Sequence, residues 1–120
     1  MTPRTAQLFG SVLALLGVVL GAFGAHFLRP VLIANNTLDV WQTGVFYQWV
    51  HALVFLALSA KVRPGPAICW LAGVVLFSGS LYILALYPTF WWAGPVTPIG
   101  GTLLIMGWIV FIADLILRKE

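Results

Sequence analysis

Charged side chains are scarce in this 120-residue sequence, at 8% of the residues, whereas 62% are hydrophobic and the mean hydropathy is +1.04. A soluble domain is about half apolar and about a quarter charged. A chain this short also cannot hide so much apolar surface, because small globules leave a large share of their residues in contact with the surroundings. The composition therefore predicts that lipid surrounds most of the protein.

Several kinds of functional chemistry are missing as well. Cys69 is the single cysteine, which excludes an intrachain disulfide and a thiolate metal site within one chain. Six Lys and Arg against three Asp and Glu are too few and too scattered for a nucleic-acid-binding stripe. The sequence also lacks a phosphate-binding glycine loop, a nucleophile elbow and a pair of carboxylates within an apolar run. We therefore expect no enzyme, no nucleic-acid ligand and no bound metal or cofactor.

The two histidines, His26 and His51, raise one specific alternative, a haem held between two helices. His26 lies near the end of the first apolar segment, and His51 lies well inside the second. At about 1.5 Å per residue this leaves them roughly 13 Å apart along the membrane normal. The two axial ligands of a haem must lie at one level, so the spacing argues against it.

What the sequence does contain is four apolar segments of about 20 residues, separated by clusters of turn-forming residues. Each segment is long enough, as a helix, to cover the roughly 30 Å of a hydrocarbon core. The short loops favour antiparallel neighbours. We therefore predict a single integral membrane domain that is all-α, a membrane-spanning antiparallel four-helix bundle comprising residues 1–120. The predicted spans are residues 7–28, 40–60, 67–87 and 99–117.

Two helix starts can be predicted more narrowly. Asn36 followed by Asp39 resembles a capping box before the second span, with Asp39 near the positive end of the helix dipole. Thr97 followed by Pro98 resembles a hydroxyl N-cap with proline at the first helical position. We therefore expect the fourth helix to begin at this pair.

Basic residues are distributed unevenly between the two ends of the predicted bundle. Arg29 alone falls on the side of the first and third loops. Cytoplasmic segments are enriched in Lys and Arg, so we expect both termini to face the cytoplasm. The five basic residues on the side of the termini and the middle loop are Arg4, Lys61, Arg63, Arg118 and Lys119.

Aromatic residues gather at the end opposite the termini. Trp and Tyr are enriched where a membrane meets water, so this group predicts an aromatic belt at the outer interface. Its members are Tyr87, Phe90, Trp91 and Trp92, with Trp41 at a similar level.

The first apolar segment permits a second interpretation. Arg4, a Leu- and Val-rich run and the small residues before His26 are also features of a secretory signal peptide. The apolar run is longer than that of a typical signal peptide, and its removal would leave three spans and a less even charge pattern. We therefore expect this segment to form the first span.

Small residues recur along the first and fourth spans. In lipid, helices associate largely through close backbone approach at such residues. Gly17 and Gly21 form a GxxxG motif, and their neighbours follow three- and four-residue spacing. This pattern predicts helix packing, either within the chain or against a second copy, through Gly10, Gly17, Gly21, Gly24, Gly100 and Gly107.

Polar side chains inside a span are costly in lipid, so they mark the candidate site. Gly44, Tyr47, Gln48 and His51 share one face of the second span, and in an antiparallel bundle the polar residues of the other spans reach the same outer half. Such a cluster either fixes helix register, or forms an outward-facing pocket in which His51 titrates or Gln48 orients a ligand, or contacts another subunit. Its members are His26, Tyr47, Gln48, His51, Ser78, Ser80 and Thr97.

Four stretches, which together sample most of the chain in order, resemble a known family. They are GAFGAHFL (21–28), WQTGVFYQWVHAL (41–53), LFSGSLYILAL (76–86) and TPIGG (97–101). They resemble the YgdD/YwdK-like family of small bacterial inner-membrane proteins of unknown function. The resemblance implies a multi-pass, four-span protein of the bacterial inner (plasma) membrane. It implies no activity, cofactor or catalytic residue.

Three functions are compatible with these observations. The first is a non-enzymatic helical bundle that is structural or binds a ligand or lipid, with membrane lipids as its partners. The second is an accessory subunit of a larger membrane complex, or a homo-oligomer, docked through its small-residue and Trp faces. The third is a small proton-linked transporter using His51. Small multidrug exporters are of similar length and span number, but they depend on a glutamate in the first span, which is absent here.

Overall fold

The computed structural model describes residues 1–118, and this part of the chain contains helices and turns but no strand. Three helices are long and apolar enough to cross a membrane: α1 (Pro3–Ala25), α4 (Pro64–Leu86) and α5 (Ala93–Leu117). The 20-residue α3 (Leu38–Ala57), which carries Gln42, Gln48 and His51, is not among these three, and α2 (Arg29–Ala34) is a short connecting helix. Lys119, one of the five basic residues noted above, lies outside the described residues.

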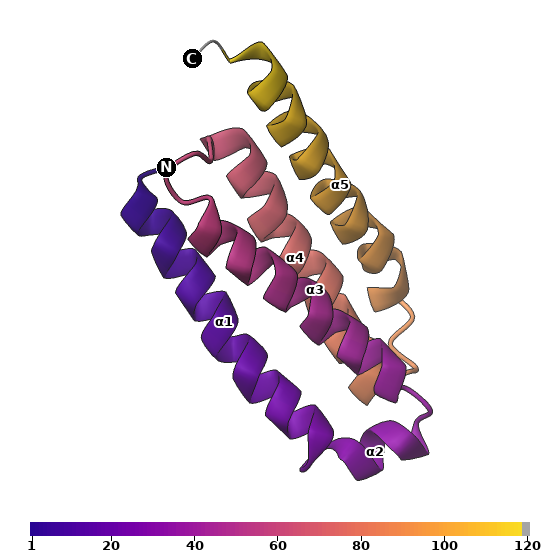
Figure 1. Ribbon diagram of the computed structural model, residues 1–120. Coiled ribbons are helices and arrows are strands. Elements are labelled where there is room, and N and C mark those ends of the chain that lie inside the picture. The colour runs from indigo at the N-terminus through magenta and orange to yellow at the C-terminus, as the bar shows by residue number, and fades with distance from the viewer. Residues whose placement is uncertain (119–120) are drawn as a thin grey trace.

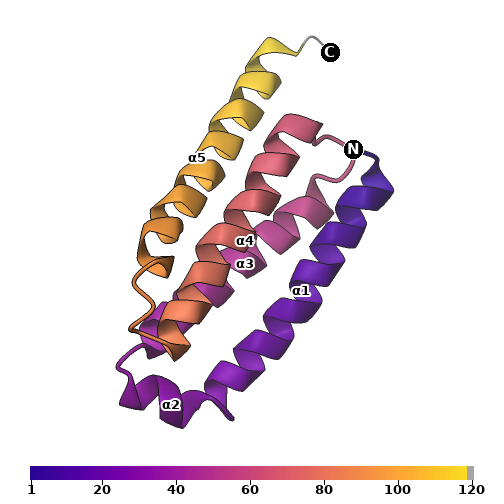
Figure 2. The same ribbon diagram turned by 180° about the vertical axis from the view of Figure 1, so that it is seen from behind.

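The long helices lie in a row. α1 packs on α3, α3 on α4 and α4 on α5. In both views of the ribbon, α3 and α4 lie between α1 and α5 (Figures 1 and 2). The described molecule is correspondingly flat, with extents of 53 × 26 × 17 Å. The two outer helices therefore present broad apolar faces to the surroundings, as the exposed side chains of Leu15 and Ile109 illustrate.

The molecule has two distinct ends. The N-terminus, the α3–α4 connection and the last turn of α5 lie at one end, which we call the termini end (Figure 1). α2 and the α4–α5 connection lie at the other end, which we call the α2 end (Figure 1). The larger apolar cluster contains Ala6, Phe55, Trp70 and Phe111, and a smaller one at the α2 end contains Leu32, Trp41 and Ala85.

The two predicted N-cap residues are wrong, although Asp39 does lie in the first turn of α3 as expected. α3 begins at Leu38, and Asn36 instead takes a left-handed φ of 57° in the turn that follows α2. α5 begins at Ala93, so Pro98 lies inside the helix and not at its first position. At this position the proline removes one helical hydrogen bond, and its ring crowds the carbonyl of Gly94 four residues earlier. The Thr97 hydroxyl donates back to the Ala93 carbonyl at 3.4 Å and does not cap the helix.

The aromatic residues at the α2 end fall into two groups. Trp91 and Trp92 are 80% and 48% exposed, as side chains of an interfacial belt would be. Trp41 is only 2% exposed, and its indole Nε1 donates to the Leu20 carbonyl at 2.9 Å. Trp41 is therefore a packing residue between α1 and α3, not a member of the exposed group.

Candidate functional site

The polar face predicted for α3 lies at the centre of the row of helices. Gln48 and His51 are 4% and 3% exposed, and Gly44 is also buried. Tyr47, on the edge of this face, is 39% exposed. Because α3 lies between α1 and α4, its polar side chains can reach both neighbours, and they do so in separate sets.

The first set joins α1, α3 and α4 through Gln48. Its Nε2 donates to the Leu13 carbonyl of α1 at 2.9 Å, and the Tyr82 hydroxyl of α4 donates to its Oε1 at 2.7 Å. One turn away, the Ser78 hydroxyl of α4 donates to the Gly44 carbonyl at 2.7 Å. These three bonds fix the register of three helices, and each uses a group that would be costly in lipid without a partner.

The second set joins α3 to α5 through His51. The Trp108 indole Nε1 donates to His51 Nε2 at 3.2 Å, and His51 Nδ1 lies 2.8 Å from the Tyr47 carbonyl. An indole N–H can only donate, so His51 Nε2 accepts and the proton of a neutral ring lies on Nδ1, facing the carbonyl. Both ring nitrogens therefore have partners within the protein. A cavity of about 270 Å³, lined by Tyr47, Phe77 and Trp108 among others, adjoins this histidine.

The third set joins α4 to α5 near the α2 end. The hydroxyls of Ser80 and Thr97 lie 2.6 Å apart, and Ser80 also donates to the Phe77 carbonyl at 2.9 Å. His26 belongs to none of these sets, because it is an exposed residue at the C-terminal end of α1. The polar residues selected from the sequence thus form three separate interhelical contacts and one isolated histidine. Among residues 1–118, no group of three or more His, Cys, Asp or Glu side chains is placed to hold a metal ion.

The glycines selected for helix packing differ in how tightly they are covered. A Cβ on Gly17 would lie 2.7 Å from Trp49 Nε1, and one on Gly107 would lie 2.7 Å from Trp70 Nε1. A Cβ on Gly10 would lie 2.9 Å from the Ala52 carbonyl oxygen, and Gly24 and Gly100 face Trp41 and the backbone of Phe77 even more closely. Gly21 is different, because a Cβ there would meet Val45 Cγ1 at an ordinary 3.6 Å.

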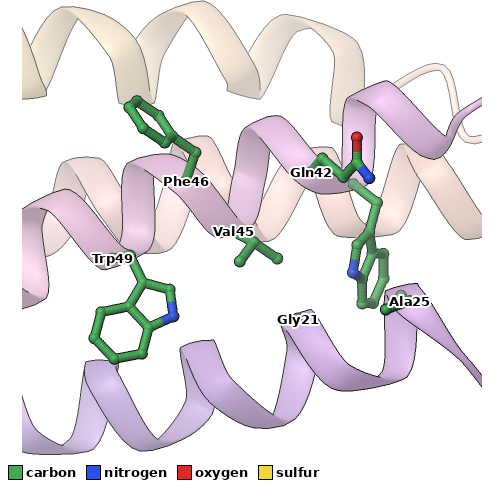
Figure 3. A pocket seen from close by; sticks show the side chains of 8 residues that line it. Gly21, Ala25, Gln42, Val45, Phe46 and Trp49 are labelled. Atoms are coloured by element: carbon green, nitrogen blue, oxygen red, sulfur yellow. The ribbon is translucent and has the colours of Figure 1, made fainter.

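The space beside Gly21 is part of a groove of about 370 Å³ between α1 and α3, which we call the α1–α3 groove. Figure 3 shows Val45 pointing into it, with Trp49 at one end and Gln42 and Ala25 at the other. The lining residues are Gly21, Gly24, Ala25, Trp41, Gln42, Val45, Phe46 and Trp49. Sequence reasoning missed this groove. The available signal was the seven-residue spacing of Gly17 and Gly24 beside the eight-residue spacing of Trp41 and Trp49.

A second groove, of about 360 Å³, lies at the α2 end, and we call it the polar groove. It is lined by Leu32, Ile33, Asn36, Leu38, Asp39 and Gln42. Gln42 lines both grooves, so the polar groove and the α1–α3 groove meet at this residue.

Comparison with known proteins agrees with the sequence resemblance. Residues 20–101 match the family model described as "Protein of unknown function (DUF423)". This chain belongs to the DUF423 family. Its relatives include the UPF0382 membrane protein YwdK of Bacillus subtilis (strain 168), 43% identical over 113 residues that cover 88% of this chain and 90% of the relative. The UPF0382 inner membrane protein YgdD of Escherichia coli (strain K12) is 39% identical over 127 aligned positions, covering 100% and 95%.

The comparisons also establish where DUF423 proteins of this kind reside. A further relative, the UPF0382 membrane protein SAB0533 of Staphylococcus aureus (strain bovine RF122 / ET3-1), is 41% identical over 112 residues covering 88% of this chain and 89% of the relative. No solved structure matches the chain. With three long apolar helices and relatives named as membrane or inner membrane proteins, this chain is a multi-pass protein of the bacterial inner membrane. The family description assigns it no biochemical function.

Proposed function

We propose that this DUF423 protein is a non-enzymatic, four-span membrane bundle with both termini in the cytoplasm, and that its α1–α3 groove holds a membrane lipid. The proposal rests on a difference between the buried polar side chains and the α1–α3 groove. The buried polar side chains of Gln48, His51 and Ser78 bond to other helices or to backbone carbonyls, whereas the α1–α3 groove is mainly apolar and lined by glycines, and no side chain of residues 1–118 fills it.

The fourth span is supported by chain geometry. α1 runs from the termini end to the α2 end, and α4 starts again at the termini end (Figure 1). If α1 and α4 cross the membrane, the chain must return between them, and α3 is the only long helix available for this return. At 20 residues, α3 covers about 30 Å, and its polar side chains are directed to neighbouring helices.

The orientation is supported by the charges of the described residues. Arg4, Lys61, Arg63 and Arg118 lie at the termini end, whereas Arg29 is the single basic residue at the α2 end. This asymmetry favours a cytoplasmic termini end. A C-terminal green fluorescent protein fusion should therefore fluoresce, and a C-terminal alkaline phosphatase fusion should be inactive. The reverse pattern would place the termini outside.

Lipid is the occupant favoured by the position and chemistry of the groove. It opens between two membrane-facing helices, and apart from Gln42 at one end its walls are glycine, alanine, valine and aromatic residues. Burial of an acyl chain here adds dispersion contacts on the Trp49 ring and on the bare backbone at Gly21. His51 supports the alternative of proton-linked transport less well, because protonation of Nε2 would set two N–H groups against each other at Trp108.

A photoreactive phospholipid tests the proposed lipid site directly. With the reactive group in the acyl chain, cross-links in proteoliposomes should map to peptides of α1 and α3 around Gly21 and Val45. Gly21→Leu fills the groove and should lower these cross-links severalfold. Gly79→Leu is the matched control, because a Cβ at Gly79 meets nothing within 4 Å and this glycine lies on α4, away from the α1–α3 groove.

Two results would contradict the proposal. Equal labelling of these peptides in wild type and Gly21→Leu would show that the groove does not hold lipid. Recovery of a stoichiometric protein partner cross-linked at the groove would support the accessory-subunit alternative instead.

A further inference from the structure

The two joined grooves change in chemical character along one face of α3. Asp39, Gln42 and Trp49 share this face, at positions i, i+3 and i+10, and they proceed from a carboxylate to an amide to an indole. Trp49 is ten positions after Asp39, which corresponds to about 15 Å along the helix. The groove therefore offers a polar end at the membrane surface and an apolar channel that runs into the membrane.

The polar end presents four side-chain oxygens, two from the Asp39 carboxylate and one each from the Asn36 and Gln42 amides. Within the described part of the chain, these three side chains form no hydrogen bond with another residue. The neighbouring turn residues behave differently, because Asn35 and Thr37 donate to the Ala85 carbonyl at 3.1 and 2.7 Å and tie the turn to α4. The left-handed φ of Asn36 separates it from these two anchors and leaves it on the groove.

Charge at the α2 end is limited to one residue of each sign. In the segments 26–40 and 86–98 of the sequence, Arg29 and Asp39 are the only residues with a charged side chain other than His26. Both are exposed. Helical spacing puts Arg29 on the same face of α2 as Leu32 and Ile33, the two α2 residues that line the polar groove. Asp39 thus lines the polar groove itself, and Arg29 lies one turn along α2 from the residues that line it.

We propose that the joined grooves select a phospholipid whose head group carries both a phosphate and a primary ammonium, as phosphatidylethanolamine does. The ammonium, which has three N–H donors, lies against the oxygens of Asn36, Asp39 and Gln42. The phosphate lies toward Arg29, and one acyl chain follows the α1–α3 groove to Trp49. This inference rests on the proposed lipid-binding function and adds the identity of the head group.

The same groups discriminate against the other common head groups. Phosphatidylglycerol supplies a phosphate for Arg29 but brings net negative charge to Asp39. Phosphatidylcholine keeps the positive charge but has no N–H to donate to the side-chain oxygens of Asn36, Asp39 and Gln42. Phosphatidylethanolamine satisfies both ends, so it should bind ahead of either.

Competition against the photoreactive lipid tests this order. In nanodiscs, unlabelled phosphatidylethanolamine should suppress cross-linking to α1 and α3 about fivefold more effectively than phosphatidylglycerol, because one charge near a membrane surface contributes about that factor. Asp39→Asn should remove this preference, whereas Asp114→Asn, the same change at the termini end, should keep it. Arg29→Gln should weaken all three phospholipids about fivefold, and Arg4→Gln should not.

The outcomes separate this inference from the function on which it rests. If the three phospholipids compete equally while Gly21→Leu still lowers cross-linking, the groove binds lipid without head-group selection and the inference is wrong. If Asp39→Asn retains the wild-type order, the ammonium contact is wrong. If Gly21→Leu has no effect on cross-linking, the proposed function itself fails, and a cross-link to a second copy at the groove would overturn both.

Discussion

Trp49 of α3 packs against Gly17 of α1 so closely that a Cβ on this glycine would fall 2.7 Å from the indole nitrogen. The same relationship recurs at the next two interfaces of the row. A Cβ on Gly44 would lie 2.8 Å from the Tyr82 ring, between α3 and α4, and Gly107 faces Trp70 between α5 and α4. Contact between an aromatic ring and a glycine is therefore common to all three helix interfaces. These contacts let neighbouring helices approach closely without a large apolar core.

Gly17→Ala should destabilise the protein because the added Cβ would press on the Trp49 ring, which can yield only in part. Overpacking of this kind costs about 1 to 3 kcal/mol. The measurement is thermal unfolding in a mild detergent, followed by the loss of monomeric protein on size exclusion. Gly21→Ala is the matched control on the same helix, since its Cβ would have ordinary van der Waals contact with Val45 at 3.6 Å. Helix propensity alone would make both alanine variants slightly more stable, so an equal loss of stability in both would show that the contact with the Trp49 ring is not what matters at Gly17.

The sequence predicted the long helices because apolar runs of about 20 residues and Pro- and Gly-rich breaks are local signals. It did not predict α2, since six residues are too few for a periodic pattern. It misplaced the start of α5, because Thr97-Pro98 has the composition of an N-cap whether or not a helix already runs through it. A local motif does not show whether the residues before it are already helical.

The candidate polar residues were predictable as a class, but their grouping was not. Helical spacing showed that Gln48 and His51 share a face, but which neighbour each meets depends on the order of helices in the row. Gln48 meets α1 and α4, whereas His51 meets α5 through Trp108. Trp41 was assigned to the interface from its level in the membrane, and it is buried because Gly24 leaves room for it on α1.

The hydrogen bond between Tyr82 and Gln48 makes a second prediction. Tyr82→Phe removes the donor to Gln48 Oε1 and should lower stability by about 0.6 to 2 kcal/mol, the range for hydrogen bonds between membrane helices. Tyr47→Phe is the control, because the Tyr47 hydroxyl forms no hydrogen bond in the part of the chain that the structure describes. In a Gln48→Leu background, Tyr82→Phe should cost nothing further. A full additional loss there would mean that the two side chains act independently.

The arrangement around His51 predicts its tautomer. Because Trp108 donates to Nε2, the ring proton should lie on Nδ1, which is the opposite of the preference of a free imidazole. Nitrogen-15 NMR of the ring in bicelles at neutral pH distinguishes the two forms, with the exposed His26 as an internal reference. Trp108→Phe should shift the Nε2 resonance while Nδ1 stays protonated. A wild-type signal from an Nε2-protonated ring would contradict the contact with Trp108.

The adjacent glycines Gly100 and Gly101, about two turns inside α5, offer the sharpest test of backbone approach. Gly100 faces the backbone of Phe77, where a Cβ would collide with main-chain atoms of α4 that cannot rotate away. Gly101 faces the Phe77 ring, and a Cβ there would lie at an ordinary 3.5 Å. Gly100→Ala should therefore separate α4 from α5 and cost more than Gly17→Ala, where a side chain can partly yield, and thus at least about 1 to 3 kcal/mol.

Gly101→Ala should be close to neutral in the same thermal unfolding measurement, or slightly stabilising, because alanine has the higher helix propensity. The two variants have the same composition and differ by one residue in position, so the expression level and general hydrophobicity are matched. A second readout separates helix displacement from general instability: the Ser80 and Thr97 hydroxyls, 2.6 Å apart across this interface, should lose their contact in Gly100→Ala and keep it in Gly101→Ala. Hydrogen exchange of the hydroxyl protons, or a double-mutant cycle with Ser80→Ala and Thr97→Ala, reports that contact. If the coupling energy between these two residues is preserved in Gly100→Ala, the packing of α4 on α5 does not depend on the bare backbone at this position.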